Sequence, residues 1–397
     1  MLVDDLGKAL RSVILNINVA KIFPKNLNKR NILYMKSITN RGGIHLFLIT
    51  SYDQLTALFL ELKRSNEKQV LLGNSYLLSN WYNCYWQKNW QLQSFACYQG
   101  DNLVCLAPFF IEKSKLFPFT KTLHLIGQGE PEYAEAALEY LDCFVKEGYE
   151  QTVYPLLVNE INKLNFDQCV VKAVFADSHI AKILPYIKGA LTQRHYAQYI
   201  VDNTQWQLIQ LSKNTRSRIN RCKNQLAKLN STVRWLTAEE YNNAWELLKS
   251  YHQHRWHNKG KTGAFSAAEF NDFHKTLRDK DSDSIAMSAV FIDEQPIAIH
   301  YYLVIDNTYH FYQSGWDEEN FAKLSPGLFL HYWSITNCPK KYYDFMMGGL
   351  NNSYKAQFNA NARAMLSVTV VKNPAKLLLS KVLNKVRHLF FSRFMSQ

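Results

Sequence analysis

The chain has 397 residues, of which 47% are hydrophobic and 20% are charged. At roughly 150 residues per domain this length predicts two or three domains. The apolar content excludes a wholly disordered protein, and the sequence has no run of about 18 apolar residues that could cross a membrane.

The net charge of +13 is spread unevenly. Residues 1–189 carry 20 Lys and Arg against 17 Asp and Glu, whereas residues 190–397 carry 26 against 16. A strongly basic half indicates an anionic partner, which leaves a phosphorylated cofactor, RNA or an anionic membrane as candidates.

The compartment predicted from the sequence is the cytoplasm. The chain opens with the acidic segment Met1-Leu2-Val3-Asp4-Asp5, whereas a secretory signal opens basic and then becomes apolar. The seven cysteines are scattered and form no C-x-x-C pair. This pattern argues against a disulfide framework and against a zinc knuckle, so we expect reduced thiols.

Short β-rich runs alternate with helical patterns along the first half. We expect strands at residues 44–49, 93–98, 103–111, 123–126, 140–145 and 169–175, and helices near residues 55–62, 81–86 and 149–164. This alternation is typical of a mixed α/β fold. A helical pattern at residues 6–22 belongs to a predicted N-terminal arm.

The second half repeats this order with different residues. We expect strands at residues 196–201, 232–235, 286–292, 296–305, 308–314, 342–346 and 365–371, and helices at residues 209–229, 238–257, 267–277 and 326–336. No sequence identity joins the halves, so the repeat is an architectural hypothesis. The basic, amphipathic residues 374–397 predict a last helix that either docks on its own protein or contacts a membrane surface.

A predicted strand leads through a short loop into a helix that begins at Ser325-Pro326-Gly327. Ser325 is the expected N-cap, Pro326 suits the first turn, and Gly327 leaves backbone N–H groups uncovered. Such a helix start attracts anions, and Lys323 adds a charge at its rim. We predict a phosphate site on the N–H groups of Ser325, Gly327 and Leu328, with an ordinary helix start as the alternative.

A second candidate feature is an acid inside an apolar strand. An ionised Asp344 is costly there unless it is paired, and Lys355 follows in the next turn. We expect these two side chains to form an ion pair, which is either structural or part of a proton-transfer site.

Two further features point less directly to a site. The predicted helix at 209–229 carries six cations, which favour either a solvated surface or a phosphate-binding one; these are Lys213, Arg216, Arg218, Arg221, Lys223 and Lys228. His252, His254 and His257 lack a fourth ligand and a nearby carboxylate, so no metal is predicted.

Several segments resemble one known family in order and spacing. Arg255-Trp256-His257-Asn258-Lys259-Gly260, followed by Gly263-Ala264-Phe265, is similar to a signature of the FemAB-like, CelD-like branch of the GNAT N-acyltransferases. Further similar segments are Glu139-Tyr140-Leu141-Asp142, the basic helix near Arg216 and Arg218, Leu324-Ser325-Pro326-Gly327-Leu328, and Tyr343-Asp344-Phe345 with Tyr354-Lys355-Ala356-Gln357-Phe358. Residues 346–353 depart from the family pattern because they lack its second acid.

The resemblance implies an α/β fold with two tandem GNAT-like domains that have mixed sheets and face a shared cleft. The domains would span residues 44–190 and 191–372, with an arm at 1–43 and a terminal helix at 373–397. It implies transfer of an acyl group from acyl-CoA to an amine of a sugar, an amino acid, or an envelope or polysaccharide precursor. Aminoacyl-tRNA as the donor, as in the FemX-like branch, is one alternative. A non-catalytic module that binds anionic lipid or polysaccharide is another.

The predicted mechanism is direct attack of the amine on the thioester. Strand N–H groups near Gln313 and Ser314, or the ammonium of Lys355, would stabilise the oxyanion. Asp344 would orient Lys355 or accept the amine proton, and the family motif adds Tyr354 to this catalytic set.

The acceptor-binding residues are implied by the resemblance alone. Arg255 and Trp256 would line the acceptor cleft from the second half, and Glu139, Tyr140 and Asp142 would contact the acceptor from the first half.

Overall fold

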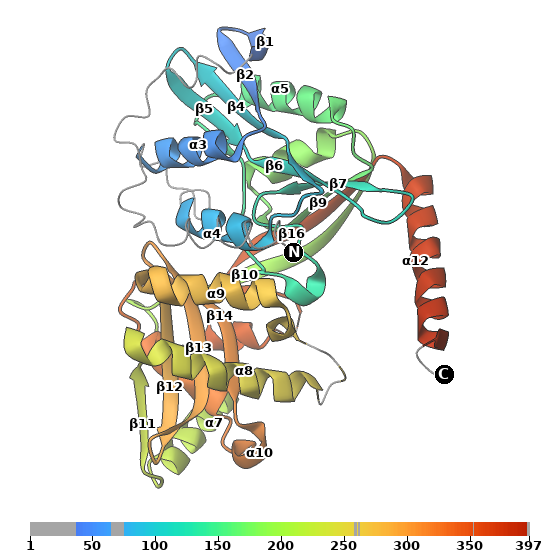
Figure 1. Cartoon of the computed structure of the whole chain (residues 1–397). Helices are drawn as coiled ribbons and strands as arrows, with labels where there is room; N and C mark the ends of the chain where they lie inside the picture. Colours follow the sequence, from blue (N-terminus) through green and yellow to red (C-terminus); the bar gives the residue numbers. More distant parts are fainter. Residues whose placement is uncertain (1–36, 65–74, 258–259, 261–262, 352, 395–397) are drawn as a thin grey trace.

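The computed structural model describes residues 37–64, 75–257, 260, 263–351 and 353–394. The first half of the chain forms the upper lobe in Figure 1, and most of the second half forms the lower lobe. The helix expected at residues 6–22 lies outside the described residues.

One sheet of the upper lobe is antiparallel throughout. Its order is β1-β2-β4-β5-β8, with bounds Ser37–Arg41, Ile44–Ile49, Ser94–Gln99, Asn102–Ala107 and Phe144–Val145. The turn from β1 to β2 uses Gly42 and Gly43, which both have positive φ angles. The arm boundary predicted at residue 43 therefore falls inside a hairpin.

The upper lobe carries four described α-helices. They are α3 (Tyr52–Arg64), α4 (Ser75–Tyr85), α5 (Glu150–Lys163) and the short α6 (His179–Ile183). In α3 the apolar side chains recur at helical spacing and are buried, at Leu55, Leu58, Phe59 and Leu62.

The strand expected at residues 103–111 is two strands in two different sheets. β5 ends at Ala107, and β6 (Phe109–Lys113) pairs with β7 and β3 instead. Pro108 between them has no N–H to offer a ladder, and its carbonyl accepts a hydrogen bond of 2.8 Å from the N–H of Ile126. The chain thus changes sheets at the proline.

A second sheet runs through both lobes. Its order is β11-β12-β13-β14-β15-β10-β16-β9-β7-β6-β3. In that order the bounds are Ser231–Trp235, Ile285–Ile292, Gln295–Ile305, Thr308–Trp316, Tyr342–Gly348, Ala190–Asp202, Asn361–Val371, Gln168–Phe175, Lys121–Leu125, Phe109–Lys113 and Trp90–Leu92. β16 from the end of the chain lies between β10 and β9, so it joins the halves. The division at residue 190 remains a prediction.

Helices cover both faces of the sheet in the lower lobe. α8 (Tyr241–His257) and α9 (Ala268–Lys280) pack on one face, and α7 (Lys213–Leu226) and α11 (Pro326–Thr336) pack on the other. Adjacent residues of β13 show the alternation. Tyr301 lies against Trp245 of α8, with ring centroids 5.2 Å apart, whereas Tyr302 donates a hydrogen bond of 2.9 Å to Ser334 of α11.

Residues 127–143, which we name the crossing segment, pass between the lobes. The strand expected at 140–145 is confined to Phe144–Val145, because Tyr140 has a φ of 65°. The Tyr140 N–H donates to the carbonyl of Ala173, and the Tyr312 hydroxyl of β14 donates to the carbonyl of Ala136. The segment is held from both sides.

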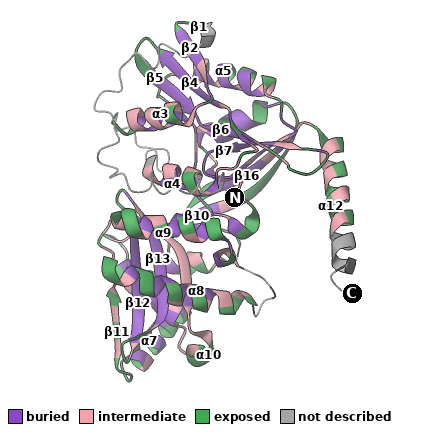
Figure 2. Cartoon of the chain, viewed as in Figure 1, coloured by how far each residue is buried: buried purple, intermediate pink, exposed green. Residues whose placement is uncertain are grey.

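The predicted C-terminal helix is α12 (Pro374–Phe394), which stands away from the lobes in Figure 1. Lys376 fastens its start through an ion pair of 2.8 Å with Asp167. Beyond this point Leu378 is 63% exposed and Val382 is 50% exposed, and Figure 2 shows the described part of α12 with half-buried and exposed residues, in contrast to the buried strands. Across the described residues, every helix is too short or too polar to span a bilayer.

Candidate active site

The site is built where two parallel strands of the lower lobe separate. β14 and β15 pair only at Thr308 with Tyr342, Tyr309 with Tyr343, and His310 with Asp344. Both strands continue beyond these pairs, β14 to Trp316 and β15 to Gly348. Their facing edges therefore diverge, which leaves a wedge in the middle of the sheet.

A cavity of about 170 Å³ lies in this wedge, and we name it the wedge cavity. Its lining comes from β14, β15, the crossing segment and nearby loops, and includes Phe311, Gln313, Phe345, Lys355 and Glu139. The predicted site residues Gln313 and Lys355 thus lie on the same cavity.

The helix start predicted to bind phosphate lies at the open end of the wedge, because α11 leads from the end of β14 back to the start of β15. Ser325 does not cap the helix with its side chain. It adopts a left-handed conformation (φ 53°, ψ 49°), and its carbonyl accepts the N–H groups of Leu328 and Phe329. The Leu328 N–H is therefore not available to a phosphate, which corrects that part of the prediction.

Gly327 faces open space at the same helix start. A Cβ added there would meet nothing closer than 4.0 Å, the nearest atoms being Nε2 of His300 and Cδ1 of Trp316. Lys323 is exposed beside it. An anion can therefore approach the Gly327 backbone closely.

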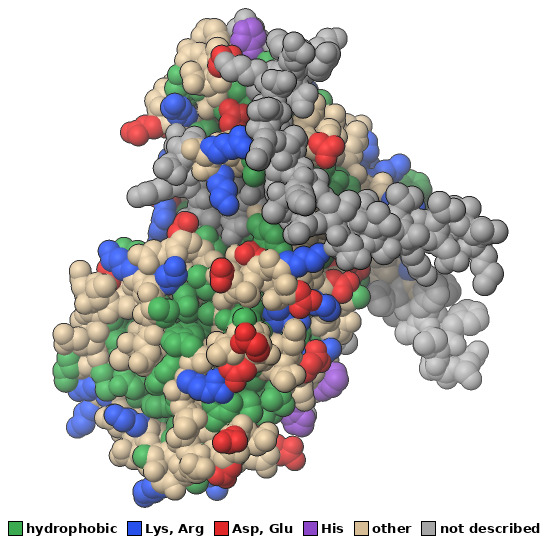
Figure 3. Space-filling model, turned by 60° about the vertical axis from the view of Figure 1, so that its left-hand side comes forward, with side chains coloured by type: hydrophobic (Ala, Val, Ile, Leu, Met, Phe, Trp, Pro, Cys, Tyr) green, Lys and Arg blue, Asp and Glu red, His purple; other side chains and the backbone are tan. Residues whose placement is uncertain are grey.

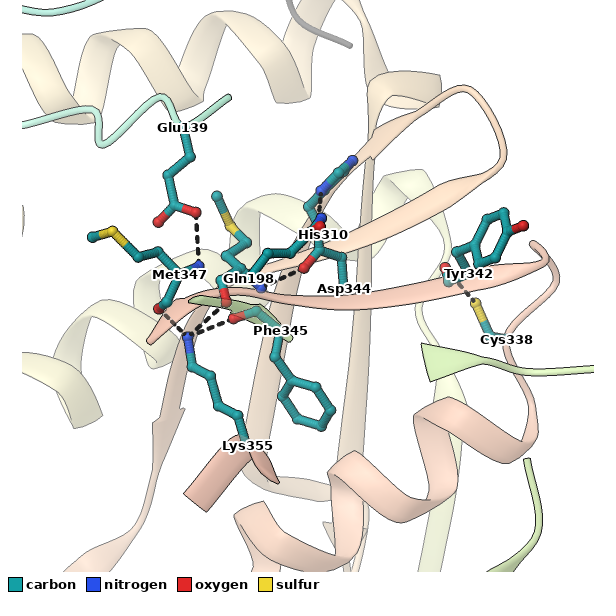
Figure 4. A network of polar contacts seen from close by, with 10 residues as sticks. Glu139, Gln198, His310, Cys338, Tyr342, Asp344, Phe345, Met347 and Lys355 are labelled. Carbon is teal, nitrogen blue, oxygen red and sulfur yellow. Dashed lines mark hydrogen bonds and ion pairs between the residues drawn. The ribbon is translucent and has the colours of Figure 1, made fainter. Parts of the chain in front are cut away.

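Asp344 does not pair with Lys355. Its Oδ2 accepts hydrogen bonds of 2.6 Å from Gln198 and 3.1 Å from Nδ1 of His310, and its Oδ1 accepts one of 2.7 Å from the Met346 N–H (Figure 4). Its side chain is fully buried and lines neither the wedge cavity nor the larger cavity on the other side of Glu139. Asp344 is therefore satisfied inside the fold and cannot receive a proton directly from a bound amine.

Lys355 and Asp344 instead hold the same β-bulge. The register of β15 against β10 shifts between Asp344 and Met347, and Met346 has a φ of 62°. The ammonium of Lys355 donates to the carbonyls of Phe345 and Met347 at 2.6 Å each, and to that of Met346 at 3.4 Å. Its burial lowers the pKa of Lys355, while Glu139 and Asp344 oppose this shift.

Glu139 reaches this bulge from the other half of the chain. Its Oε2 accepts a hydrogen bond of 2.8 Å from the Met347 N–H, as Figure 4 shows. Burial raises the pKa of the Glu139 carboxyl to about 7, although the Met347 N–H and Lys355 favour its charged form. A carboxyl with this pKa on a cavity wall is suited to take a proton near neutral pH.

A larger cavity of about 550 Å³ lies on the other side of Glu139, and we name it the junction cavity. It is lined by the crossing segment, β9, β10, β16 and Met347. Glu135, Ala137 and Glu139 line both cavities. The two cavities are therefore neighbours across this short stretch of chain, and Glu139 faces each of them.

The other first-half residues have structural roles. Both carboxylate oxygens of Asp142 accept backbone N–H groups, at 2.9 Å from His179 and 2.7 Å from Ile180, so this side chain holds the start of α6. Tyr140 is buried with its ring stacked on Phe175 at 4.8 Å. Neither residue lines a cavity of the site, so the structure does not bring them to an acceptor.

The second-half residues implied by resemblance also lie off both cavities. Arg255 pairs with Glu318 at 3.2 Å, and the Trp256 indole N–H donates to Nε2 of His252 at 2.7 Å. Tyr354 is 43% exposed and packs its ring against His331, at 5.7 Å between centroids. Ser314 lies beside Gln313, whose Oε1 accepts its N–H at 3.3 Å.

The basic helix α7 carries a shallow groove of about 610 Å³ on its outer face, lined by Lys213, Arg216, Ser217, Asn220, Arg221, Asn224, Gln225 and Lys228. α7 packs against α11, so this groove is on the same side of the sheet as the Gly327 helix start. The face of the lower lobe in Figure 3 differs, because acidic and basic side chains are interspersed there among hydrophobic ones.

Sequence reasoning missed Gln198 and His310, which hold Asp344, and Glu130 and Glu135, which line the junction cavity. One signal was present, since Glu130, Glu135 and Glu139 all stand in a segment rich in alanine and leucine. Across the described residues, no group of three or more His, Cys, Asp and Glu is gathered closely enough to hold a metal ion.

Residues 213–356 match a family model described as an acetyltransferase (GNAT) domain. The chain carries a GNAT acetyltransferase domain. The match runs from α7 to the turn that bears Lys355, so it includes both strands of the wedge and the helix between them. This domain supports an acyltransferase, and the mixed α/β, GNAT-like fold predicted from the sequence is confirmed.

The structure of FemX extends the likeness in fold to both lobes of the chain. The crystal structure of FemX aligns with a TM-score of 0.54 at 13% identity, covering 83% of this chain and 99% of FemX. L-PGS from Bacillus licheniformis aligns with a TM-score of 0.48 at 11% identity, covering 85% of this chain and 96% of that one. A tandem GNAT protein from the clavulanic acid biosynthesis pathway aligns with a TM-score of 0.41 at 8% identity, covering 82% and 98%. The search of curated proteins gave no match.

Proposed function

We propose that this GNAT protein transfers an acyl group from a thioester, acyl-CoA, to the amine of a small acceptor. The observation that carries the proposal is the wedge between β14 and β15, with Gln313 and Lys355 on its cavity and the carboxyl of Glu139 at its edge. This arrangement offers a slot for an extended donor and a base beside it.

The donor would lie in the wedge. The facing edges of β14 and β15 lack each other's hydrogen bonds beyond His310 and Asp344. Unpaired strand edges bind an extended chain that carries amide groups, as the pantetheine arm of CoA does. Its diphosphate would reach the Gly327 N–H and Lys323 at the start of α11, and the cations of α7 lie on the same side of the sheet.

The chemistry would take place beside Glu139. The acceptor amine attacks the thioester carbonyl, a C–N bond forms, and Glu139 accepts the amine proton. The C–S bond then breaks, and the thiolate leaves and takes up a proton. The side-chain amide of Gln313 lines the wedge cavity and would stabilise the oxyanion. Lys355 would act by holding the bulge carbonyls and by keeping Glu139 ionisable.

Calorimetric titration with acetyl-CoA and with longer acyl-CoA esters tests the donor site directly. We expect binding to wild type, with loss of affinity when Phe345 is replaced by Trp, because the larger ring fills the wedge cavity. Exposed Phe119, which lies on neither cavity, supplies the matched control Phe119→Trp. Absence of binding by every CoA ester would contradict acyl-CoA as the donor.

Aminoacyl-tRNA is the alternative donor. The groove of α7 supports it, because a row of Lys and Arg on one helix face fits the phosphates of RNA as well as those of CoA. A transfer assay with radiolabelled aminoacyl-tRNA, run beside one with acetyl-CoA, separates the two. Product from the tRNA donor alone, lost in Arg221→Ala, would replace acyl-CoA in the proposal.

We also propose peripheral contact of α12 with an anionic membrane, consistent with a cytoplasmic protein. Leu378, Leu379, Val382 and Val386 are between 40% and 63% exposed, and residues 374–397 contain no Asp or Glu. Exposed apolar residues beside cations are typical of an interfacial helix. In vesicle flotation we expect binding to phosphatidylglycerol vesicles, no binding to phosphatidylcholine, and loss of binding in Val382→Asp. Equal recovery with both lipids would rule this contact out.

That the acceptor is an envelope or polysaccharide precursor is a proposal that rests on the family resemblance. A non-catalytic module for anionic lipid or polysaccharide would bind vesicles or glycans yet show no response to any thioester.

A further inference from the structure

The junction cavity is acidic, although the protein as a whole is strongly basic. Its charged lining residues are Glu130, Glu132, Glu135, Glu139, Lys172 and Arg194, whereas the whole chain has a net charge of +13. Glu135 is neutralised by an ion pair of 2.7 Å with Lys172. Arg194 and Glu132 are exposed, so they lie toward the mouth. The buried carboxyls are Glu130 and Glu139.

Glu130 is poorly satisfied in this cavity. It is 5% exposed, its Oε1 accepts a hydrogen bond of 2.8 Å from the Ala136 N–H, and no described residue donates a hydrogen bond to its Oε2. The indole N–H of Trp81 lies near enough to favour the charged carboxyl but falls short of hydrogen-bond geometry. Burial raises the pKa of Glu130 to about 7. A buried carboxylate oxygen that lacks a good hydrogen bond is a candidate contact for a bound cation.

Three neutral polar side chains of the cavity already make hydrogen bonds with the backbone. The Gln128 amide donates to the Lys172 carbonyl at 2.6 Å and accepts the Lys172 N–H at 3.0 Å. The Ser367 hydroxyl accepts the Ala173 N–H at 3.1 Å, and the Thr192 hydroxyl reaches the Thr369 carbonyl at 3.5 Å. The Gln128 side chain is therefore held by the backbone of β9.

Apolar side chains make up much of the remaining wall, namely Leu138, Val170, Val171, Val368 and Met347. A volume of about 550 Å³ exceeds what a single ammonium group needs and lies within the range of small-molecule sites. A cavity lined by apolar side chains together with two buried carboxyls suits a methylene chain with a cation at each end.

Resting on the proposed function, we propose that the junction cavity binds the acceptor and that this acceptor is an aliphatic diamine, with its reacting amine at Glu139 and its second ammonium at Glu130. Among the acceptors that the sequence left open, a sugar amine can match Glu139 but carries no second charge. An amine with one charge would leave Glu130 unmatched.

The predicted pH dependence follows from the two buried carboxyls. Each must be ionised to bind an ammonium, and both change charge near pH 7. The other charged groups that line the cavity are Lys172, Arg194, Glu132 and Glu135, and Lys355 lies beside Glu139. Diamine affinity should therefore rise from pH 6 to pH 8, where the carboxyls are deprotonated and the diamine is still a dication.

Calorimetric titration without any donor tests the proposal separately from transfer. The probes are 1,4-diaminobutane, 1,5-diaminopentane, butylamine and glucosamine. We expect a diamine to bind about tenfold or more tightly than butylamine, as an added charge-assisted contact provides, and Glu130→Gln to remove this preference. Exposed Glu147 gives the matched control Glu147→Gln, which should keep it.

Equal affinity for diamine, butylamine and glucosamine would overturn the proposal, and so would an unchanged preference in Glu130→Gln. Diamine binding without thiol release from any acyl-CoA would leave the cavity assignment standing and would contradict the proposed transfer. Thiol release by glucosamine but not by diamines would support the transferase and reject the diamine.

Discussion

The two cavities on either side of Glu139 are built in different ways. The wedge cavity rests mainly on one stretch of chain, from β14 through α11 to β15 and the turn with Lys355. The junction cavity combines the crossing segment, β9, β10 and β16, which are far apart in the sequence. The proposed donor side is thus a local unit, whereas the proposed acceptor side depends on how the halves meet.

Their buried titratable groups also differ. On the donor side, burial keeps His300 and His331 neutral by lowering their pKa values. On the acceptor side, burial raises the pKa values of Glu130 and Glu139 to about 7. Neutral bases thus lie where the proposed phosphorylated donor would bind, and ionisable acids lie where the proposed amine would bind.

The largest expected effect is at the residue that both cavities share. Replacing Glu139 by Gln keeps an acceptor for the Met347 N–H but removes the proposed base. We expect kcat to fall by about 10²–10⁴, the usual contribution of a general base. In wild type the rate should rise through about pH 7, as Glu139 loses its proton, and this rise should be missing in the variant. Steady-state kinetics with an unchanged pH profile would remove Glu139 from the mechanism.

The acceptor side should lose stability as the pH rises. The folded pKa of Glu130 is about 7, above the unfolded value of about 4.3, so folding favours the protonated form. Its contribution is complete below the unfolded value and is lost as the pH passes 7. Glu130→Gln should therefore gain about 2–3 kcal/mol relative to wild type between pH 5 and pH 8. Urea unfolding of both proteins at pH 5 and pH 8 measures this gain. If the free energies of unfolding of variant and wild type differ by the same amount at both pH values, Glu130 does not titrate in the folded protein.

The bulge that separates the cavities depends on Lys355. Lys355→Met would leave the carbonyls of Phe345 and Met347 without their donor, which costs about 1–3 kcal/mol of unfolding free energy. Loss of the cation should also raise the pKa of Glu139, so the rise of rate with pH should move upward. Lys381 on the exposed face of α12 offers the control Lys381→Met. A variant with unchanged stability and an unshifted pH–rate profile would show that Lys355 neither stabilises the bulge nor affects the pKa of Glu139.

Gly315 and Gly327 differ in what surrounds them, since one is packed against a helix and the other faces open space. A Cβ at Gly315 would lie 2.6 Å from the carbonyl oxygen of Leu248 in α8, so Gly315→Ala should cost about 1–3 kcal/mol. A Cβ at Gly327 meets nothing closer than 4.0 Å, so Gly327→Ala should keep full stability yet weaken acyl-CoA binding. Thermal unfolding and calorimetry of the pair test this. If the two variants lost the same stability, Gly327 would be required for packing and not for ligand binding.

The smallest expected effect is the pH response of the donor side, which is opposite in sign. The pKa of His300 is about 3 in the fold, against about 6.5 when unfolded. Its contribution is complete above 6.5 and falls with pH by about 1.4 kcal/mol per unit. His300→Asn should reduce this loss between pH 6.5 and 5.5 by about 1 kcal/mol, because the unfolded imidazole is already half protonated at pH 6.5. Urea unfolding at the two pH values gives the slope, and an identical slope in the variant would contradict a neutral His300.

The candidate site could be predicted from the sequence only in part. Asp344 and Lys355 were expected to pair because both need partners and lie close in sequence. In the fold they hold the N–H and carbonyl groups of one bulge instead, since Gln198 and His310 satisfy the carboxylate. Glu139 was implied only by resemblance, because its pKa arises from burial against the other half of the chain.

Local pattern determined much of this protein. Apolar periodicity gave the order of strands and helices, and the unit from β14 to β15 could be anticipated because its parts are adjacent in the chain. Only the tertiary structure decided that Pro108 divides a strand between two sheets, that β16 joins the halves, and that the carboxyls of the crossing segment face a cavity. These features depend on contacts between backbone groups and side chains that are far apart in the sequence. The local spacing of residues does not determine such contacts.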